Sequence, residues 1–453
     1  MYPASRQQQP DVSTDKHSPA TVETVGAQAG WRARLALNAS TGALLAAILL
    51  VGMGSELWSP LMPDYLSELE ATVLLIALYG SVKDFLDAVN FYLGGILAAR
   101  FNTRRALLLF NAIPLVGLVI LLIWPNKYAI FVALPFVGVW NSIAGPATLR
   151  VVGDTLAEHR RSMAFSLQSI QKRVSSLLAY FASGELVLWL GQIQGLRAAL
   201  ALSMLLIAIS WLIQYRYMRT AVSDKVRVHH KPLELLRQLN PQLRRLLVSE
   251  TCVRWCDALP RELIILYCLP ILGPLLRTSA MQTPAQLSVI AAAFYVGVLL
   301  VVMNVTSLIC YLPVGHWASK GGSAKKPFIG LTFVFFALFP MTLVLFGGKW
   351  GVWGFVLAFV VCGLREFGEP ARKAMITELV PAECRTQAIG IYWSARCAGI
   401  TPASFVGGLI WYFAGPRTML WCAGAFGVLG ASLFYLRFKG VDEKPVPEPL
   451  TAT

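Results

Sequence analysis

The chain has 453 residues, of which 56% are hydrophobic and only 14% are charged. Soluble globular proteins carry about 25% charged residues, so this composition excludes a soluble enzyme with a solvated surface and also excludes long stretches of disorder. It fits a membrane protein that crosses the bilayer several times. The formal net charge of +15 would suggest a nucleic-acid partner in a soluble protein, so the position of the charges along the chain decides what they mean.

Twelve apolar spans of about 20 residues follow one another along the chain. After a polar tail, 1–34, six spans form the first half: 35–58, 71–98, 106–124, 128–152, 163–190 and 196–215. A basic linker, 216–245, contains an amphipathic run at 233–239 that predicts a surface helix. Six more spans follow, 246–271, 288–317, 328–346, 350–375, 387–414 and 419–438, and then a tail, 439–453. The pattern predicts an all-α membrane protein with twelve transmembrane helices in two pseudo-symmetric six-helix bundles.

Basic residues are unevenly divided between the two sides of these spans. The side that holds both tails and the linker has 26 of them, with Arg372, Lys373 and Arg437 counted there, whereas the opposite loops have 5. Lys and Arg accumulate in cytoplasmic loops, so we expect both termini and the linker to be cytoplasmic. The short loops favour a bacterial cell membrane. The positive charge then marks orientation, and no nucleic-acid partner is expected.

Two stretches of the first half recur in the second half. Near the ends of spans 71–98 and 288–317, a glycine is followed by a basic residue five positions on and by two further basic residues. These residues are Gly95, Arg100, Arg104, Arg105 and Gly315, Lys320, Lys325, Lys326. A second repeat, offset by 224 positions, pairs Asp154, Arg161 and Lys172 with Glu378, Arg385 and Arg396. Repeats of six helices about an axis along the membrane normal are a transporter architecture.

These motifs resemble those of the major facilitator superfamily, over nearly all of 35–438. The family's loop signature is roughly G-x-x-x-D-R-x-G-R-[RK], which Gly95, Arg100, Arg104 and Arg105 match, while Ala99 and Ser319 stand where the family has an acid. The resemblance implies two bundles that rock about a central cavity, with these loops gating it through contacts across the bundles. It also implies a secondary transporter and names no substrate.

Span 71–98 carries charges at mid-membrane depth, where an ionised group costs about 2.5–3.5 kcal/mol and commonly marks an ion or substrate path. Lys83, Asp87 and Asn90 share one helix face, and Asp84 lies beside them. One interpretation is an intrahelical pair between Lys83 and Asp87 that only stabilises the bundle. The other is a face that lines the cavity, with one carboxylate available for a proton or a cation.

Two spans of the second half carry further charges. In 246–271 a stripe of alternating sign, formed by Glu250, Arg254, Asp257 and Arg261, predicts either internal salt bridges or, because Pro260 bends a helix, a gate. In 350–375 the cluster is Arg365, Glu366 and Glu369, and its repeat counterparts in the first half are uncharged. This asymmetry favours substrate or coupling-ion chemistry over a structural clamp.

Three isolated charges complete the candidate cavity. Lys172 and Arg396 are related by the repeat, and each would either bind an anionic group or neutralise the carboxylates of spans 71–98 and 350–375. Glu56 lies near the outer end of span 35–58, as a residue of the cavity mouth or as a proton site.

These features together predict a secondary active transporter that moves a small polar or charged solute by alternating access. We expect proton coupling through Asp84, Asp87, Glu366 or Glu369, since protonation removes the cost of a buried charge. Drug efflux by proton antiport and a non-transporting membrane sensor or assembly partner are the alternatives. No phosphate-binding G-x-x-x-x-G-K-[ST] loop occurs, and no enzyme activity, cofactor or metal is expected. The expected partners are a small-molecule substrate and membrane lipid, with the chain as a monomer.

Overall fold

The computed structural model describes residues 39–100, 103–139, 158–217, 239–279, 285–318, 325–380 and 385–438, nearly all of them helical. The helices follow the twelve predicted spans. Those of the first half are α2 (Ala39–Trp58), η1 (Ser59–Leu61), α3 (Met62–Glu68), α4 (Val73–Arg100), α5 (Thr103–Ile123), α6 (Ala129–Val137) and α8 (Glu158–Tyr217). Those of the second half are α10 (Pro241–Ala258), α11 (Ile264–Ser279), α12 (Ala285–Ala318), α13 (Lys325–Phe346), α14 (Val352–Leu364), α15 (Glu369–Glu378), α16 (Arg385–Ala414) and α17 (Pro416–Arg437).

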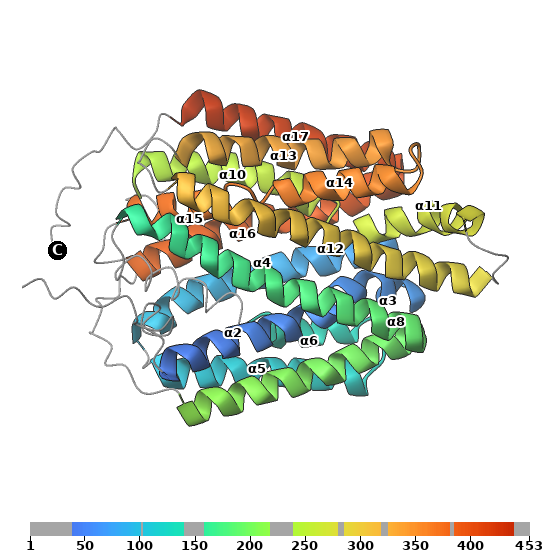
Figure 1. Cartoon of the computed structure of the whole chain (residues 1–453), viewed down its shortest axis with the longest axis horizontal. Helices are drawn as coiled ribbons and strands as arrows, with labels where there is room; N and C mark the ends of the chain where they lie inside the picture. The colour runs from blue at the N-terminus through green and yellow to red at the C-terminus, as the bar shows by residue number, and fades with distance from the viewer. Residues whose placement is uncertain are drawn as a thin grey trace, which may run out of the picture.

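The spans run back and forth between two ends of an elongated bundle (Figure 1). We call one end the linker end, where α8 finishes at Tyr217, α10 begins at Pro241 and α17 finishes at Arg437. The opposite end is the distal end, where α2 gives way to η1 and where α4 begins at Val73.

Two glycines at the distal end extend the internal repeat. Gly191 has φ 77° where α8 turns back on itself, and Gly415 has φ 84° between α16 and α17. L-residues with a side chain are strained at such angles, whereas glycine is not. The two positions differ by 415 − 191 = 224, the same offset that relates Asp154, Arg161 and Lys172 to their counterparts in the second half. The halves therefore share the turn as well as the loops.

Two of the predicted spans are broken in the middle. The chain leaves the α-helix between α10 and α11, at Leu259–Leu263, where Pro260 stands as the sequence indicated. The second break, at Arg365–Gly368 between α14 and α15, was not expected, because 350–375 was predicted as one helix. Two features accompany it: Pro370 lacks an N–H group, and Gly368 packs so closely on Phe328 and Thr332 of α13 that a side chain has no room.

Some predicted boundaries were also wrong. Helix α10 begins at Pro241, five residues inside the predicted linker, because Asn240 caps its N-terminus by accepting a hydrogen bond from the Gln242 N–H. Helix α13 begins at Lys325 rather than at 328, since Lys325 is buried and paired. The rest of the predicted linker, 218–238, and the second part of span 128–152, from 140, lie outside the described residues.

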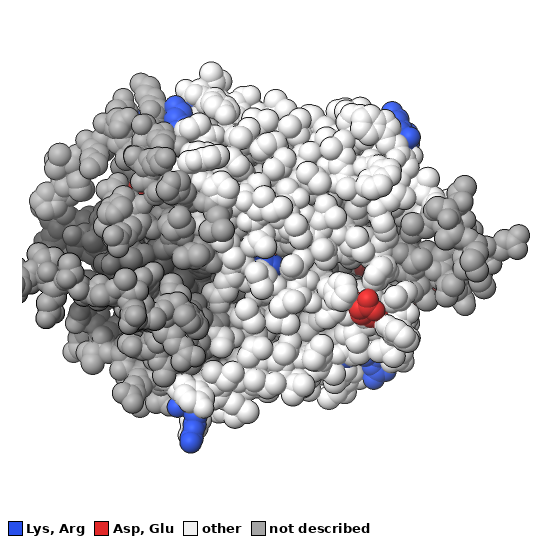
Figure 2. Space-filling model, viewed as in Figure 1, with Lys and Arg blue, Asp and Glu red and all other residues white. Residues whose placement is uncertain are grey.

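The surface between the two ends is largely free of charge. Figure 2 shows a broad uncharged band on this face, interrupted by one basic side chain near its centre and one acidic side chain toward the distal end. Within the described residues, five stretches are long and apolar enough to cross a membrane by themselves: 192–217, 294–311, 325–346, 387–414 and 416–437. Helix α4 is not among them, because Lys83, Asp84 and Asp87 interrupt it. The band is the surface expected of a protein embedded in lipid.

The two halves meet along two pairs of helices. Helix α4 packs on α16, and α8 packs on α12 (Figure 1). Toward the distal end, Gly408 of α16 sits directly on Ala77 of α4. Toward the linker end, the rings of Phe91 and Trp393 lie 5.1 Å apart, edge to face. The halves are thus in contact on both sides of the middle of the bundle.

Candidate functional site

The charged residues of the described spans gather between the two halves, mostly around the two broken helices. We call this set the charged layer. Its members are Lys83, Asp84, Arg173, Glu250, Arg254, Asp257, Arg261, Glu262, Arg365, Glu366, Glu369, Arg372, Lys373 and Arg396. Most keep partial exposure inside the bundle, from 33% for the Lys83 side chain to 12% for Asp257, whereas Glu250 keeps 1%.

One link across the halves joins α8 to the break between α14 and α15. The Arg173 guanidinium lies 3.0 Å from Glu366 and donates hydrogen bonds to Tyr311 and Asn304 of α12, both at 3.2 Å. Tyr311 also donates to Glu366, at 3.3 Å. Glu366 itself lies in the non-helical turn that follows α14, which ends at Leu364.

A second link joins α4 to the break between α10 and α11. Arg261 donates to Asp84 at 2.8 Å, and Lys83 lies 3.7 Å from Glu262. Both second-half residues belong to the non-helical turn around Pro260, which presents their two opposite charges to α4. The ion pair that Lys83 makes with Glu262 reaches across to the other half. The pair with Asp87, four positions along α4, stays a prediction.

The two breaks are also joined to each other. Asp257, at the end of α10, accepts a hydrogen bond from Arg365 at the end of α14, and lies 3.8 Å from Arg261. Arg365 and Glu369 were expected to lie one turn apart on a continuous helix. Because the helix is broken between them, Arg365 turns toward Asp257 while Glu369 turns toward Arg372.

A third group lies within the second half, toward the linker end, and centres on Glu250. This buried carboxylate accepts hydrogen bonds from Arg372 at 2.6 Å, Arg396 at 3.0 Å and Tyr392 at 2.6 Å. Glu369 accepts two more from Arg372, at 2.6 and 2.9 Å. The forked guanidinium of Arg372 therefore bridges two carboxylates, a geometry that lysine cannot reproduce.

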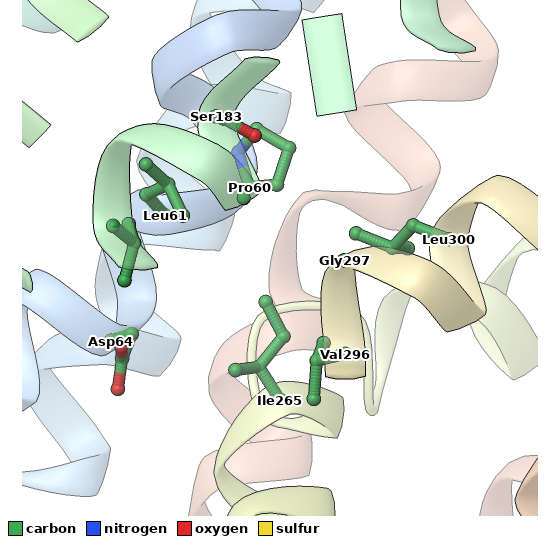
Figure 3. A pocket seen from close by; sticks show the side chains of 10 residues that line it. Pro60, Leu61, Asp64, Ser183, Ile265, Val296, Gly297 and Leu300 are labelled. Carbon is green, nitrogen blue, oxygen red and sulfur yellow. The ribbon is translucent and has the colours of Figure 1, made fainter. Parts of the chain in front are cut away.

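The distal side of the interface encloses a small cavity (Figure 3). One wall comes from the first half, with Asp64 and Ser183, and the other is apolar and comes from the second half, with Ile265 and Val296. Its volume of about 30 Å³ is room for one or two water molecules, so it is no solute site in this conformation. Burial, together with the nearby Glu68 carboxylate, raises the pKa of Asp64 in α3, outside the spans, to about 7, although Gln192 donates a hydrogen bond to it at 2.8 Å.

The remaining predicted cavity residues occupy different surroundings. Lys172 is exposed on α8, and it is the neighbouring Arg173 that turns inward. Glu56 accepts a hydrogen bond from Tyr180 at 2.7 Å, within the first half. Asp87 is partly buried on α4, and the buried Asn90 amide nitrogen on the same helix has no acceptor among the described residues.

The predicted gating loops fall largely at the edge of what the structure describes. Asp154 and Lys320 lie outside the described residues, and of Gly95, Arg100, Arg104, Arg105, Arg161, Gly315 and Arg385 only the helical backbone is described. Lys326 is partly buried at the start of α13. Lys325 and Glu378 form a buried pair at 2.6 Å, which joins α13 to α15 inside the second half and does not cross between the halves.

Sequence reasoning missed some members of the charged layer as site residues. Arg372 and Lys373 were counted with the linker-side loops, but Arg372 is buried and Lys373 nearly so. Arg173 and Glu262 lie within spans 163–190 and 246–271 and were not predicted as site residues, and Glu250 and Arg261 were predicted only as members of the alternating stripe. The alternating stripe of α10 was the signal for Glu250; nothing in the pattern distinguished Arg173 from Lys172.

The comparisons with known proteins agree with this architecture. The family model described as Major Facilitator Superfamily matches the chain twice, over residues 44–269 and 263–453. A comparison with curated proteins finds no match. Because the two matched stretches cover both halves, the family assignment does not depend on any single motif.

Solved transporter structures share the fold at low sequence identity. The human organic anion transporter MFSD10 (TETRAN) superposes with a TM-score of 0.64 at 13% identity, covering 87% of this chain and 99% of that chain. The proton:xylose symporter XylE bound to 6-bromo-6-deoxy-D-glucose gives 0.63 at 12%, covering 89% and 96%. The nucleoside transporter NupG gives 0.65 at 12%, covering 89% and 100%. The chain is an integral membrane protein that belongs to the Major Facilitator Superfamily of transporters.

Proposed function

We propose that this protein is a secondary active transporter that moves a small polar or charged solute by alternating access and couples the movement to protons. The observation that carries the proposal is the set of ion pairs across the halves, above all Arg173 with Glu366 and Arg261 with Asp84. A permanently joined pair of bundles would be held more favourably by apolar contacts, because buried charges must be stripped of water. Charges that meet at a moving interface are instead free to change partners.

The two strongest links have a property suited to coupling. In each, a carboxylate of one half is neutralised by an arginine of the other half. When the halves rock apart, Asp84 and Glu366 lose that arginine, and a proton is the simplest replacement for its charge. One carboxylate oxygen of Asp84 and one of Glu262 are already buried without a hydrogen-bond partner among the described residues. The Asp84 oxygen is a place where a proton binds without displacing another group, whereas the Glu262 oxygen is the one that faces Lys83 at 3.7 Å.

The broken helices support the same function. Discontinuous helices that place backbone ends and charges at mid-membrane depth are a recurring feature of transporters. Here, both breaks lie beside the cross-half links, at Arg261–Glu262 and at Arg365–Glu366. A break lets one half of a span tilt while the other stays packed, which is the motion that opening at one end requires.

The orientation in the membrane is part of the proposal. We infer that the linker end faces the cytoplasm, because the basic residues of the sequence concentrate on that side by 26 to 5. The chain is proposed to act as a monomer in a bacterial cell membrane, with lipid around the uncharged band. The matched transporters carry an organic anion, xylose and a nucleoside, according to their names, and such solutes form the first panel to test.

The test uses the full chain in proteoliposomes that contain a pH-sensitive dye. A gradient of each panel solute is applied, and the internal pH is recorded together with the uptake of labelled solute. At least one solute is expected to move protons, and Asp84→Asn and Glu366→Gln are expected to stop the proton flux. Glu185→Gln, which removes a carboxylate bonded to Trp189 at the distal end, is the matched control. Solute uptake with no proton movement would refute the coupling.

A further inference from the structure

We propose that the cationic cluster formed by Arg254, Arg372, Lys373 and Arg396 binds a carboxylate or phosphate group of the transported solute. The inference rests on the proposed function and narrows the solute to an organic anion. It concerns the part of the charged layer toward the linker end, in which every basic group is supplied by α10, α15 or α16 of the second half.

The first argument is the charge balance. The four cations of the cluster have only two carboxylates within ion-pair distance among the described residues, Glu250 and Glu369. A purely structural clamp needs one anion for each buried cation, because an uncompensated charge away from water is strongly unfavourable. These six groups leave a net charge of 4 − 2 = +2, which a bound mono- or dianion would reduce.

The second argument is that the carboxylates are not shared evenly. Arg372 makes hydrogen bonds to both Glu250 and Glu369. Arg254 is left at 3.9 Å from Glu250 and 3.8 Å from Glu369, beyond hydrogen-bond distance. Its side chain keeps 19% exposure, and its guanidinium lies over the Phe336 ring, 5.0 Å from the centroid. Arg254 is therefore oriented by an aromatic face, and its N–H groups are available to a ligand.

The third argument is the type of atom that lacks a partner. The guanidinium Nε of Arg396 and the indole Nε1 of Trp393 are buried with no acceptor among the described residues. Both belong to α16, three residues apart, and the Arg396 guanidinium lies 5.8 Å from the Trp393 ring centroid. Both groups can only donate, so the missing partner is an acceptor. The oxygens of a carboxylate or phosphate are acceptors with several lone pairs, and arginine binds them through its planar fork.

The fourth argument is the position of the cluster against the other half. Lys373 donates to Ser169 of α8 at 3.3 Å, and Trp393 meets Phe91 of α4. Both contacts lie on the linker side of the interface, so separating the halves there uncovers the cluster. A solute entering or leaving from that end meets these donors, while Arg173 and Glu366 lie deeper, next to Tyr311 of α12.

The experiment measures thermal unfolding of the full chain in detergent by intrinsic tryptophan fluorescence, at constant ionic strength. The probes are sodium succinate, sodium phosphate and glucose 6-phosphate, with choline chloride and glucose as cationic and neutral probes. We expect at least one of the three anions to raise the unfolding temperature in a saturable manner. Constant ionic strength matters because salt alone screens exposed charges.

The diagnostic variant is Arg254→Gln, chosen because Arg254 makes no close ion pair and its loss leaves the bonds to Glu250 in place. We expect it to weaken the anion effect at least about tenfold, the loss typical for a hydrogen bond to a charged group. Arg254→Lys keeps the charge without the fork and is expected to be intermediate. Arg244→Gln removes an exposed arginine from the same helix, ten residues away, and is expected to bind like the unaltered chain.

Three outcomes overturn the inference. Saturable stabilisation by choline or glucose alone places the solute in another class, and an anion effect that survives Arg254→Gln places the anion elsewhere. Absence of an effect with all three anions also excludes the site. In each case proton-coupled uptake in proteoliposomes is measured separately, so the proposed function stands or falls on its own evidence.

Discussion

The two halves of the molecule are built on one plan, yet they hold their charges differently. In the first half, α8 runs unbroken past Arg173, and that arginine reaches the interface from an intact helix. In the second half, most of the central charges lie where α10 meets α11 and where α14 meets α15, although α16, the repeat counterpart of this part of α8, is continuous. The shared turn glycines, Gly191 and Gly415, show that the scaffold is common to both halves.

This difference between the halves shows where, on a repeated scaffold, the charged groups concentrate. A continuous helix fixes side chains at regular intervals, so neighbouring charges of one face point the same way. Where the helix is broken, Arg365 and Glu369, which are four positions apart, point toward different partners, Asp257 and Arg372. The second half thus contributes most of the charged layer, and the first half supplies a few partners that it pairs with.

The largest expected effect is the loss of the carboxylate at the centre of the second half. Glu250→Gln leaves Arg372 and Arg396 without the charge that neutralises them, and breaking a buried pair costs about 3–5 kcal/mol. We expect a large drop in unfolding temperature or in the yield of folded protein. The matched change in the first half, Glu185→Gln, is expected to have little effect. Equal stability of the two variants would contradict the asymmetry.

The next effect concerns the distal cavity. The wall from the first half contains the titratable Asp64 carboxyl, whereas the wall from the second half is apolar. The pKa of Asp64 is about 7 in the folded chain, whereas the ordinary value of 3.8 applies to the unfolded chain. Between pH 3.8 and pH 7 the folded chain therefore holds a proton that the unfolded chain has lost. The stability that this proton contributes is fully present below pH 3.8 and is lost as the pH rises toward 7. The free energy of unfolding must therefore fall by about 1.4 kcal/mol for each pH unit within this window.

Replacing Asp64 with asparagine tests this dependence. Asp64→Asn is expected to flatten the profile of unfolding temperature between pH 4 and pH 7 and to keep the hydrogen bond with Gln192. The comparison is made with the unaltered chain across the same buffers. If the two profiles run parallel, the Asp64 carboxyl does not titrate in this window.

A moderate effect separates links across the halves from links within one half. In a double-mutant cycle of Arg173→Gln and Glu366→Gln, we expect a coupling of about 0.5–3 kcal/mol in stability. Transport is expected to be lost, because the link has to form and break in each cycle. The pair Lys325 and Glu378 in the second half should show similar coupling with transport retained. If disrupting either pair abolishes transport, then ion pairs across the halves do not differ in function from ion pairs within one half.

The smallest effect tests the common scaffold. Gly191→Ala and Gly415→Ala each force a side chain into a backbone region at positive φ with ψ of 174° and 165°, which is essentially restricted to glycine and costs about 1–3 kcal/mol. Neither position has another atom within 4 Å of the added methyl group, so backbone strain is the whole of the expected loss. The two variants should lower the unfolding temperature by similar amounts. A clear inequality would mean that the two turns are not equivalent.

Much of the architecture could be predicted from the sequence, because lipid imposes a simple rule. A helix that crosses a bilayer needs a long apolar run, and each run is visible without knowledge of its neighbours. The break at Pro260 was visible for a similar reason, since proline acts locally. The break at Arg365–Gly368 was not, because it depends on how closely Gly368 approaches Phe328 and Thr332 of α13.

The candidate site was predicted only as a set of charges. Helical spacing offered Asp87, four positions along the same span, as one partner for Lys83. The structure pairs Lys83 with Glu262 and Arg365 with Asp257, on other parts of the chain. Both partners are more than 100 positions away, and helical periodicity carries no information about them.

By itself, the sequence determined the class, the number of spans, the repeat and the family resemblance, because hydrophobicity and short loop motifs are local properties. The tertiary structure decided which charges face one another, since that depends on how α4, α8, α10 and α15 pack. It selected Arg173 over Lys172, and it placed the buried Arg372 between Glu250 and Glu369. Residues one position apart on a helix differ by about 100° in direction, and only packing decides which of them turns inward.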